Sequence, residues 1–313
     1  MLQLRIITPP DITHDILHQL RTDHGATNIT LHPGAGVQPE GDLVIVDVAR
    51  ERANVVVDLL IAAGVRERGS ISLISLEAST SRAAATAEEL ATGHGSDALV
   101  WEQLEELARN DSAMSFTFVI LMMLAALIAA VGIIVDSAVL VIGAMIVGPE
   151  YGPLNAISVS LFRRRHYGRR AAFKLAVGLV LAIAAAAAAT AFFRGIDQVP
   201  RDFETADRFF TSFVSEPNVF SAVVAFAAGI VGSLSLAQGR HTTLAGVLVS
   251  VTTIPAAAAL GVDVVFGDWS DAGGAAAQLA INLASILVAS IATLVVQDRA
   301  WRRAGSAPLR LKS

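Results

Sequence analysis

The stretch that decides the fold is residues 132–153, which read GIIVDSAVLVIGAMIVGPEYGP. A helix that crosses a membrane needs about 20 mostly apolar residues. The segment Ala138–Phe162 is long enough, but the run Gly148–Pro153 interrupts it. Because proline lacks a backbone N–H and clashes with the preceding turn, it ends or kinks a helix. The stretch therefore predicts a membrane helix that is broken inside the bilayer.

Further apolar segments surround this one. Residues 114–297 carry 20 of the 51 charged residues in 184 positions, whereas the other 129 positions carry 31. This distribution and the hydrophobic fraction of 54% exclude a purely soluble enzyme, a disordered chain and a fibrous protein. Six membrane spans are predicted: Met114–Val135, Ala138–Phe162, Ala171–Phe193, Val219–Leu236, Thr242–Val262 and Gly273–Val296.

Basic residues predict the orientation of these spans. With both termini in the cytoplasm, the inner loops and the tail carry 11 Lys and Arg, and the outer loops carry only Arg194, Arg201 and Arg208. Cytoplasmic loops of membrane proteins carry the excess of basic residues. We therefore expect a multi-pass protein of the bacterial plasma (inner) membrane with cytoplasmic N- and C-termini.

The first 77 residues are predicted to form a small cytoplasmic α+β domain. Alternation of apolar residues indicates strands, and apolar residues at helical spacing indicate helices. The predicted strands are Leu2–Ile7, Ile29–Leu31, Asp42–Val48 and Ser70–Leu76. The predicted helices follow an N-cap at Asp11 and span Ala53–Ala63 up to Gly64, and a turn is expected at Pro33-Gly34. The order βαββαβ is typical of the ferredoxin-like fold.

Three further regions complete the predicted organisation. Residues 78–113 form a linker with an amphipathic juxtamembrane helix. Residues 114–297 form the six-span transmembrane domain, and residues 298–313 form a basic cytoplasmic tail.

The two halves of the membrane domain share a rhythm of glycine and proline. Gly143 precedes Pro153 by ten residues, and Gly246 precedes Pro255 by nine. Each half has three predicted spans, so two copies would be inverted relative to each other. Inverted repeats with helices broken at matching places are typical of secondary transporters with a site near the bilayer midplane. The alternative is that glycine and proline are simply common in membrane helices.

Several of these motifs together resemble the bacterial "domain of unknown function 389" membrane family. The resemblance rests on the stretch from Gly132 to Pro153, on residues 228–240 (AGIVGSLSLAQGR), on Gly246, Val247 and Pro255, and on Asn282. It covers residues 97–297 and implies a multi-span membrane domain behind a small soluble domain, with no established function. The family commonly has Leu-Met where this chain has Glu150-Tyr151, and it often has two adjacent prolines where Ile254 precedes Pro255. A role for Glu150 is therefore a hypothesis about this chain alone.

Glu150 is the first candidate for a functional residue. It lies about 12 residues into its predicted span, near the bilayer centre at about 1.5 Å per residue. A charge at that depth costs at least about 2.5–3.5 kcal/mol, so an intramembrane acid faces a cavity or a partner. Glu150 and carbonyls of the broken helix would then form a site for an ion, a proton or a substrate. Alternatively, the segment is a re-entrant hairpin or loop, and Glu150 reaches lipid headgroups or pairs with Arg163 or Arg164.

Other polar and helix-breaking residues extend the predicted substrate or ion path. In the second half, threonine hydroxyls beside Pro255 would line the path, or would bond the carbonyls that the proline frees. Gln278 and Asn282 lie four residues apart on one face, where hydrogen bonds between helices are expected. The complete predicted set is Pro149, Glu150, Gly152, Pro153, Asn155, Thr252, Thr253, Pro255, Gln278 and Asn282.

The sequence favours transport over catalysis. The chain has no cysteine, no phosphate-binding loop and no nucleophile elbow, so neither an enzyme nor a bound cofactor is expected. The net charge of −5 gives no basic surface for nucleic acid. We expect a secondary transporter or channel for a small solute or ion, regulated by its cytoplasmic domain and assembled as a homo-oligomer. The alternative is a membrane-anchored sensor of a small ligand, or a scaffold, that does not transport.

Overall fold

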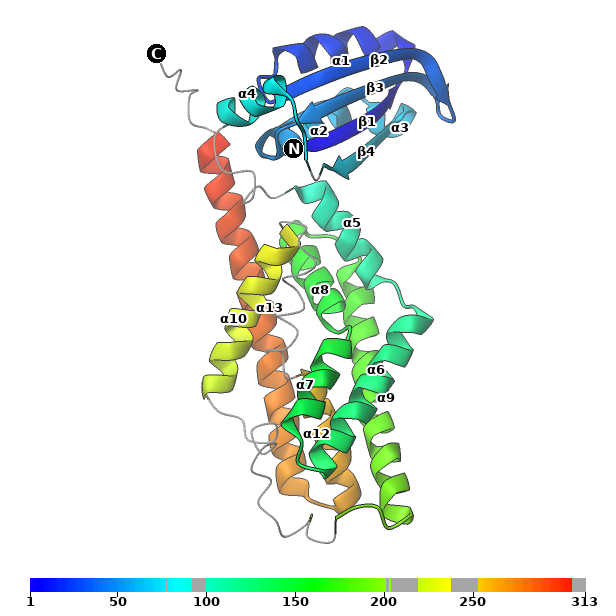
Figure 1. The fold of residues 1–313 in the computed structure, drawn as a ribbon, viewed down its shortest axis with the longest axis vertical. Helices are drawn as coiled ribbons and strands as arrows, with labels where there is room; N and C mark the ends of the chain where they lie inside the picture. The colour runs from blue at the N-terminus through cyan, green and yellow to red at the C-terminus, as the bar shows by residue number, and fades with distance from the viewer. Residues whose placement is uncertain (77, 92–99, 201–202, 204–218, 238–252, 306–313) are drawn as a thin grey trace. The chain divides into compact units, whose positions relative to one another are not determined.

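The computed structural model describes residues 1–76, 78–91, 100–200, 203, 219–237 and 253–305 (Figure 1). The chain divides into two compact units. The first comprises Met1–Leu104 with Gln297–Ser313, and the second comprises Glu105–Val296.

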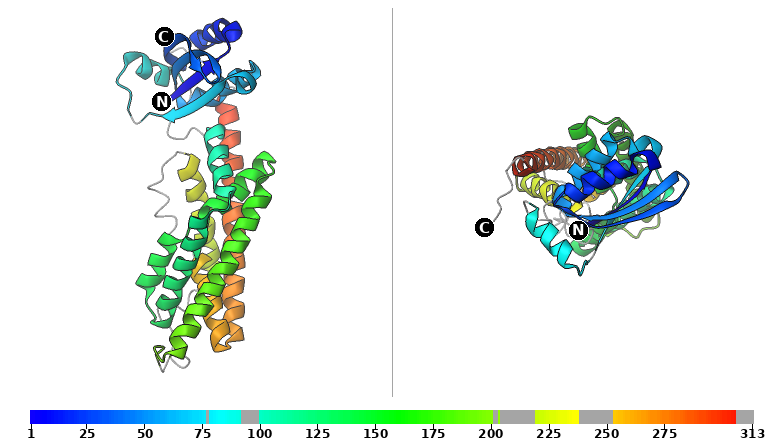
Figure 2. Two further views of the ribbon diagram at one scale, coloured as in Figure 1. Left: turned by 90° about the vertical axis from the view of Figure 1, so that its right-hand side faces the viewer. Right: turned by 90° about the horizontal axis from the view of Figure 1, so that it is seen from above.

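A four-stranded antiparallel sheet organises the N-terminal unit. Its elements are β1 (Leu2–Thr8), α1 (Pro10–Thr22), β2 (Ala26–Val37), β3 (Glu40–Val48), the 3-10 turn η1 (Arg50–Arg52), α2 (Ala53–Ala62), α3 (Val65–Arg68), β4 (Ser70–Ser75) and α4 (Arg82–Leu90). The strands are ordered β2-β3-β1-β4, and each neighbouring pair is antiparallel (Figure 2). The small α+β sheet predicted from alternation is thereby confirmed.

One face of the sheet forms the core of this unit. In the central strand, Leu4 lies opposite Val46 of β3 and Leu73 of β4. Alternate residues of a strand point to the same face, and those of β1 and β3 on this face are fully buried. Side chains of α1 and α2 pack against them, namely Ile16, Leu20, Val56, Val57 and Leu60.

Two predicted features of this unit are wrong. Asp11 is not the N-cap, because α1 already begins at Pro10 with Pro9 as its cap. Proline suits the first helical position, where its missing N–H has no partner in the helix. Asp11 instead accepts hydrogen bonds from Arg68 at 2.8 and 2.9 Å, and these bonds lower the pKa of its carboxyl group.

The turn predicted at Pro33-Gly34 is also wrong, because β2 continues to Val37. Gly34 has a φ of 63°, and the pairing with β3 is irregular between His32 and Gly36. Since β2 lies at the edge of the sheet, a proline and a bulge fit there without the loss of an inner ladder bond.

The remaining elements are apolar helices and the helix that precedes them. Their bounds are α5 (Trp101–Ser112), α6 (Phe116–Ile134), α7 (Ala138–Val147), α8 (Tyr151–Arg163), α9 (Gly168–Gly195), α10 (Val219–Ala237), α12 (Thr253–Phe266) and α13 (Trp269–Gly305). Four of them, α6, α9, α10 and α13, are long and apolar enough to cross a membrane, and the bent pair α7–α8 makes a fifth span if counted as one. These helices indicate a multi-pass membrane protein. The predicted span Thr242–Val262 lies partly outside the described residues, and the part within them belongs to α12.

Small residues let these helices approach closely. Alanines of α6, α9 and α12 are buried against one another: Ala125, Ala126, Ala129, Ala182, Ala186, Ala257 and Ala258. At Gly261 of α12, an added Cβ would lie 2.6 Å from the backbone oxygen of Ile183 in α9. Close approach of backbones through glycine and alanine is how helices associate in membranes.

Two glycine-to-alanine variants test this packing. Gly261→Ala is expected to destabilise the membrane domain by about 1–3 kcal/mol, because backbone atoms must move to admit the methyl group. Gly143→Ala is the matched control, since no atom lies within 4 Å of its added Cβ, and it should be neutral or stabilising by about 0.5–1 kcal/mol. Thermal unfolding in detergent micelles measures both. Equal melting temperatures for the two variants would contradict the close α9–α12 contact.

Candidate functional site

A break between α7 and α8 forms the centre of the candidate site. α7 ends at Val147, Gly148 caps it in an extended conformation, and α8 starts at Tyr151 with an axis bent by 51°. Pro149 causes the break, because a residue before proline disfavours the helical conformation and proline cannot donate to the preceding turn. Pro153 lies in the first turn of α8, where no N–H is needed. The predicted interruption of the second span is therefore present, and Pro149 is its cause.

Glu150 lies in this break and is fully buried. Its Oε1 accepts a hydrogen bond of 2.7 Å from Oγ1 of Thr253, the first described residue of α12. Its Oε2 has no hydrogen-bond partner among the described residues. Two predicted site residues that are 103 positions apart are thus brought together, and one carboxylate oxygen beside them stays unbonded.

The two helices that meet at this hydrogen bond have corresponding sequences. α8 has 13 residues and α12 has 14, and the third residue of each is a proline, Pro153 and Pro255. Thr253 bonds Glu150 across the site, a contact that was not expected when its hydroxyl was assigned to a path or to carbonyls freed by Pro255. Thr252 lies outside the described residues.

Further polar side chains lie on the first turns of α8. Asn155 is buried, and neither its amide nitrogen nor its amide oxygen has a hydrogen-bond partner among the described residues. The Tyr151 hydroxyl is buried facing Ser233 of α10 and Ser290 of α13, and the Tyr151 ring leaves no room for a Cβ at Gly232. Buried polar atoms are nearly always hydrogen-bonded in native proteins. The free oxygen of Glu150 and the amide of Asn155 are therefore groups that suit an ion, a proton or a small polar solute.

Gln278 and Asn282 form a polar pair on α13. Both are buried, and Gln278 Nε2 donates to Asn282 Oδ1 at 3.0 Å. This bond lies within one helix, whereas bonds between helices were expected. α12 ends at Phe266, and α13 begins at Trp269. With the same rise per residue in both helices, Asn282 lies at about the depth of Thr253.

The length of α12 gives the depth of the site. Its 14 residues span about 20 Å from Thr253 to Phe266. Because a hydrocarbon core is about 30 Å thick, Glu150 lies inside the core, between its centre and the side from which α8 emerges. This position agrees roughly with the depth estimated from the sequence.

The alternative ion pair of Glu150 receives no support from the described contacts. Arg163, one of its two suggested partners, donates to Glu105 of α5 at 2.6 Å. Gly152, another predicted site residue, lies against the Asp111 carboxylate of α5, so it packs and does not line the carboxyl group of Glu150. Pro149 is half-buried in the break itself.

One buried charge and the tyrosine were missed in the sequence. Lys174 of α9 is buried, donates to the Asp111 backbone oxygen at 2.8 Å, and lies 4.5 Å from the centre of the Phe118 ring. The signal was available, because Lys174 is a charge inside a predicted span. Tyr151 was noted only as a departure from the resembled family.

Comparison with known families bears directly on this region. Residues 145–288 match the family described as "Domain of unknown function (DUF389)". This chain is a member of the DUF389 family. The matched range of the DUF389 domain contains the α7–α8 break, α12 and the polar pair of α13. No curated protein and no solved structure shows significant similarity to the chain.

A double-mutant cycle tests the contact at the centre of this DUF389 domain. Thr253→Val removes the donor to a buried carboxylate and should destabilise the domain by about 1–3 kcal/mol. In a Glu150→Leu background the same change should have little effect, because its partner is already absent. Thermal unfolding in detergent micelles gives the four melting temperatures.

Thr293→Val is the matched control for this cycle. The Thr293 hydroxyl bonds a carbonyl of its own helix at 2.8 Å, so its loss should not depend on Glu150. If Thr253→Val has the same effect with and without Glu150, the bond between them does not stabilise the site.

Proposed function

We propose that this DUF389 protein is a secondary transporter or channel for a small solute or ion, whose path passes the α7–α8 break. The observation that carries the proposal is the fully buried Glu150 carboxyl group, bonded on one oxygen by Thr253 and unbonded on the other. Intramembrane carboxylates are costly, and they commonly mark ion paths or proton relays. A cation or a proton at the free oxygen would neutralise the group.

An inverted repeat of three plus three spans supports the same function. The paired features are the half-helices α8 and α12, each with a proline at its third described position, and the bond that joins their first turns. Broken helices at corresponding positions of two repeats commonly form the substrate or ion site of transporters. In this proposal the membrane domain has six spans, with α12 completing the fifth.

The proposed setting is the bacterial plasma membrane with both termini in the cytoplasm. The support is the excess of basic residues in the loops that this topology places inside. The N-terminal unit is proposed to be ferredoxin-like, because its element order and the strand order β2-β3-β1-β4 agree with the split βαβ arrangement. Its proposed role is to regulate the path within a homo-oligomer, and no catalytic activity is assigned to the chain.

A sensor or scaffold without transport is the second candidate. The observation in its favour is that Glu150 and Thr253 are both fully buried and bonded to each other, as a packed and dry membrane domain requires. In that case the N-terminal unit binds the ligand and the apolar helices only anchor it.

A flux assay separates the two candidates. The full chain is reconstituted in liposomes that contain a pH-sensitive dye, and Na⁺, K⁺ or proton gradients are imposed in turn. The wild type should dissipate at least one gradient, and Glu150→Gln should slow that flux by at least about tenfold, because the amide cannot bind a cation or exchange a proton as a carboxylate does.

Asp197→Asn is the matched control for the flux assay. It makes the same carboxylate-to-amide change at an exposed residue after α9, and asparagine tolerates the φ of 53° found there. Flux that is unchanged in Glu150→Gln removes the site. Absence of any flux through the wild type, together with a ligand-induced rise in the melting temperature of the full chain, favours the sensor.

A further inference from the structure

The turn between α8 and α9 is unusually rich in arginine. Five of the eight residues from Arg163 to Arg170 are arginines. Three of them, Arg164, Arg169 and Arg170, are exposed and form no ion pair with any described residue. This turn therefore carries a surplus of positive charge that the described part of the chain leaves uncompensated.

Hydrogen bonds to Ser160 hold the turn in one conformation. The Ser160 hydroxyl accepts from the Gly168 N–H at 2.9 Å and donates to the Arg165 carbonyl at 2.5 Å. The Ser160 carbonyl accepts from the Arg165 N–H at 2.9 Å, and Arg164 has a left-handed φ of 52°. The guanidinium groups are thus presented from a pre-formed backbone, which reduces the entropy lost when they bind a ligand.

The exposed arginines lie where a membrane helix begins. Arg169 and Arg170 occupy the first turn of α9, which is long and apolar enough to cross a membrane. Phe173 follows them by four and three residues, on the same helical face, and is 67% exposed. On α8, Leu161 is 60% exposed two residues before Arg163. Charge followed by exposed apolar side chains matches the boundary between phospholipid headgroups and acyl chains.

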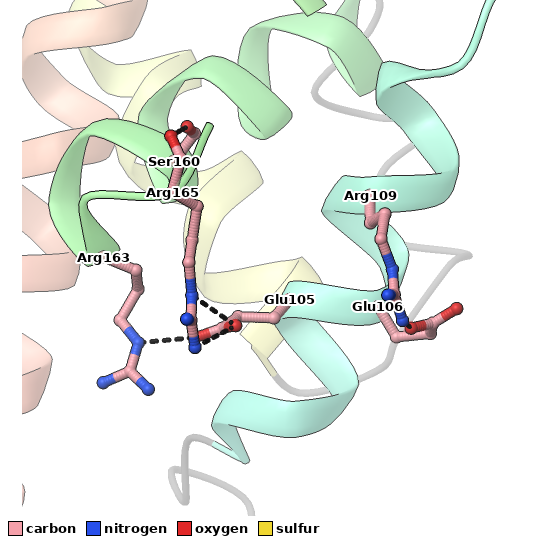
Figure 3. A network of polar contacts seen from close by, with 6 residues as sticks. All are labelled: Glu105, Glu106, Arg109, Ser160, Arg163 and Arg165. Atoms are coloured by element: carbon pink, nitrogen blue, oxygen red, sulfur yellow. Dashed lines mark hydrogen bonds and ion pairs between the residues drawn. The ribbon is translucent and has the colours of Figure 1, made fainter. Parts of the chain in front are cut away.

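The same turn already binds one oxyanion. The Glu105 carboxylate of α5 accepts from Arg163 Nε at 2.6 Å and from Arg165 Nε at 2.9 Å (Figure 3). Glu105 is only 19% exposed, so it is held between the two guanidinium groups. The next residue, Glu106, bonds Arg109 on its own helix and contributes no described contact to the turn.

A neutral hydroxyl group completes the surroundings of this oxyanion. The Tyr167 hydroxyl is buried and has no hydrogen-bond partner among the described residues. Burial, together with the nearby charge of Glu105, raises the pKa of Tyr167 to about 12, so the hydroxyl keeps its proton and is free to donate. Arginine forks and a hydroxyl donor suit the oxygens of a phosphate as well as those of a carboxylate.

We propose that the α8–α9 turn binds the phosphate of an anionic phospholipid headgroup through Arg164, Arg169 and Arg170, and that Glu105 competes with this phosphate for Arg163 and Arg165. The lipid is the favoured source of the phosphate because the arginines precede an apolar, membrane-length helix. Binding of the headgroup weakens the attachment of α5 to the turn. This inference does not depend on the transport proposal.

The binding test uses the purified full chain. Retention of phosphatidylglycerol and phosphatidylcholine is compared by native mass spectrometry. The wild type should retain phosphatidylglycerol preferentially, and the triple variant Arg164→Gln, Arg169→Gln and Arg170→Gln should lose at least about tenfold in affinity for it, since each basic residue near the surface adds to the attraction. The control Arg21→Gln, Arg66→Gln and Arg82→Gln removes the same charge from exposed sites of the N-terminal unit and should change nothing. Equal losses in both triple variants overturn the site.

The competition has its own test, with a sign that a merely topological role does not predict. Glu105→Gln frees Arg163 and Arg165 and should tighten phosphatidylglycerol binding several-fold. Glu106→Gln is the matched control on the same helix and should leave the affinity unchanged. If Glu105→Gln weakens binding or leaves it as in the wild type, Glu105 is not a competitor.

Two further measurements protect these results. A cysteine at Ser313, labelled from either side of liposomes, reports orientation, because the chain has no other cysteine. If the triple Gln variant inserts the wrong way round, the triple Arg→Lys variant keeps the charge and should still bind phosphatidylglycerol several-fold more weakly, because lysine cannot form the bidentate contact. Displacement of the lipid by millimolar inorganic phosphate would overturn the lipid in favour of a free phosphate ligand.

Discussion

A polar group inside a bilayer must find its partner within the protein, because hydrocarbon supplies none. The membrane domain is arranged around this requirement at the α7–α8 break. Pro149 ends one helix, and the next begins at once at Tyr151, so few backbone groups are left outside helical bonding. The Glu150 carboxylate is carried into the interior by this interruption and meets the Thr253 hydroxyl. That contact requires α12 to come close, and close approach is possible because glycine and alanine line the helix contacts.

The charged residues of the second unit follow the same requirement, with different solutions at different places. Lys174 is buried, and it directs its ammonium group to a backbone oxygen and an aromatic ring. Arg163 and Arg165 share one carboxylate at the end of α8. Only at Glu150 and Asn155 do buried side chains of the broken helix keep unbonded atoms among the described residues. This contrast makes the break the best-supported candidate site.

Patterns with a short period could be read from the sequence, whereas contacts between distant segments could not. Alternation located the sheet of the N-terminal unit, and Gly148 and Pro149 located the break. Edge placement of β2 was not visible, so the turn at Pro33-Gly34 was wrong. Glu150 and Thr253 were each identified, but their hydrogen bond depends on the rotation of two helices about their axes. A helix turns by about 100° per residue, and hydrophobic spacing does not fix that angle well enough.

The bend between α7 and α8 also has a mechanical consequence. α8 is a rigid arm of 13 residues, about 20 Å long, fixed at one end to the break and ending at Arg163. A swing of about 5° at the break would move the far end of this arm by about 2 Å. The distance between a hydrogen-bonded and a separated Arg163–Glu105 pair is of that size. The broken helix therefore acts as a lever, which converts a small rearrangement around Glu150 into the making or breaking of a surface ion pair.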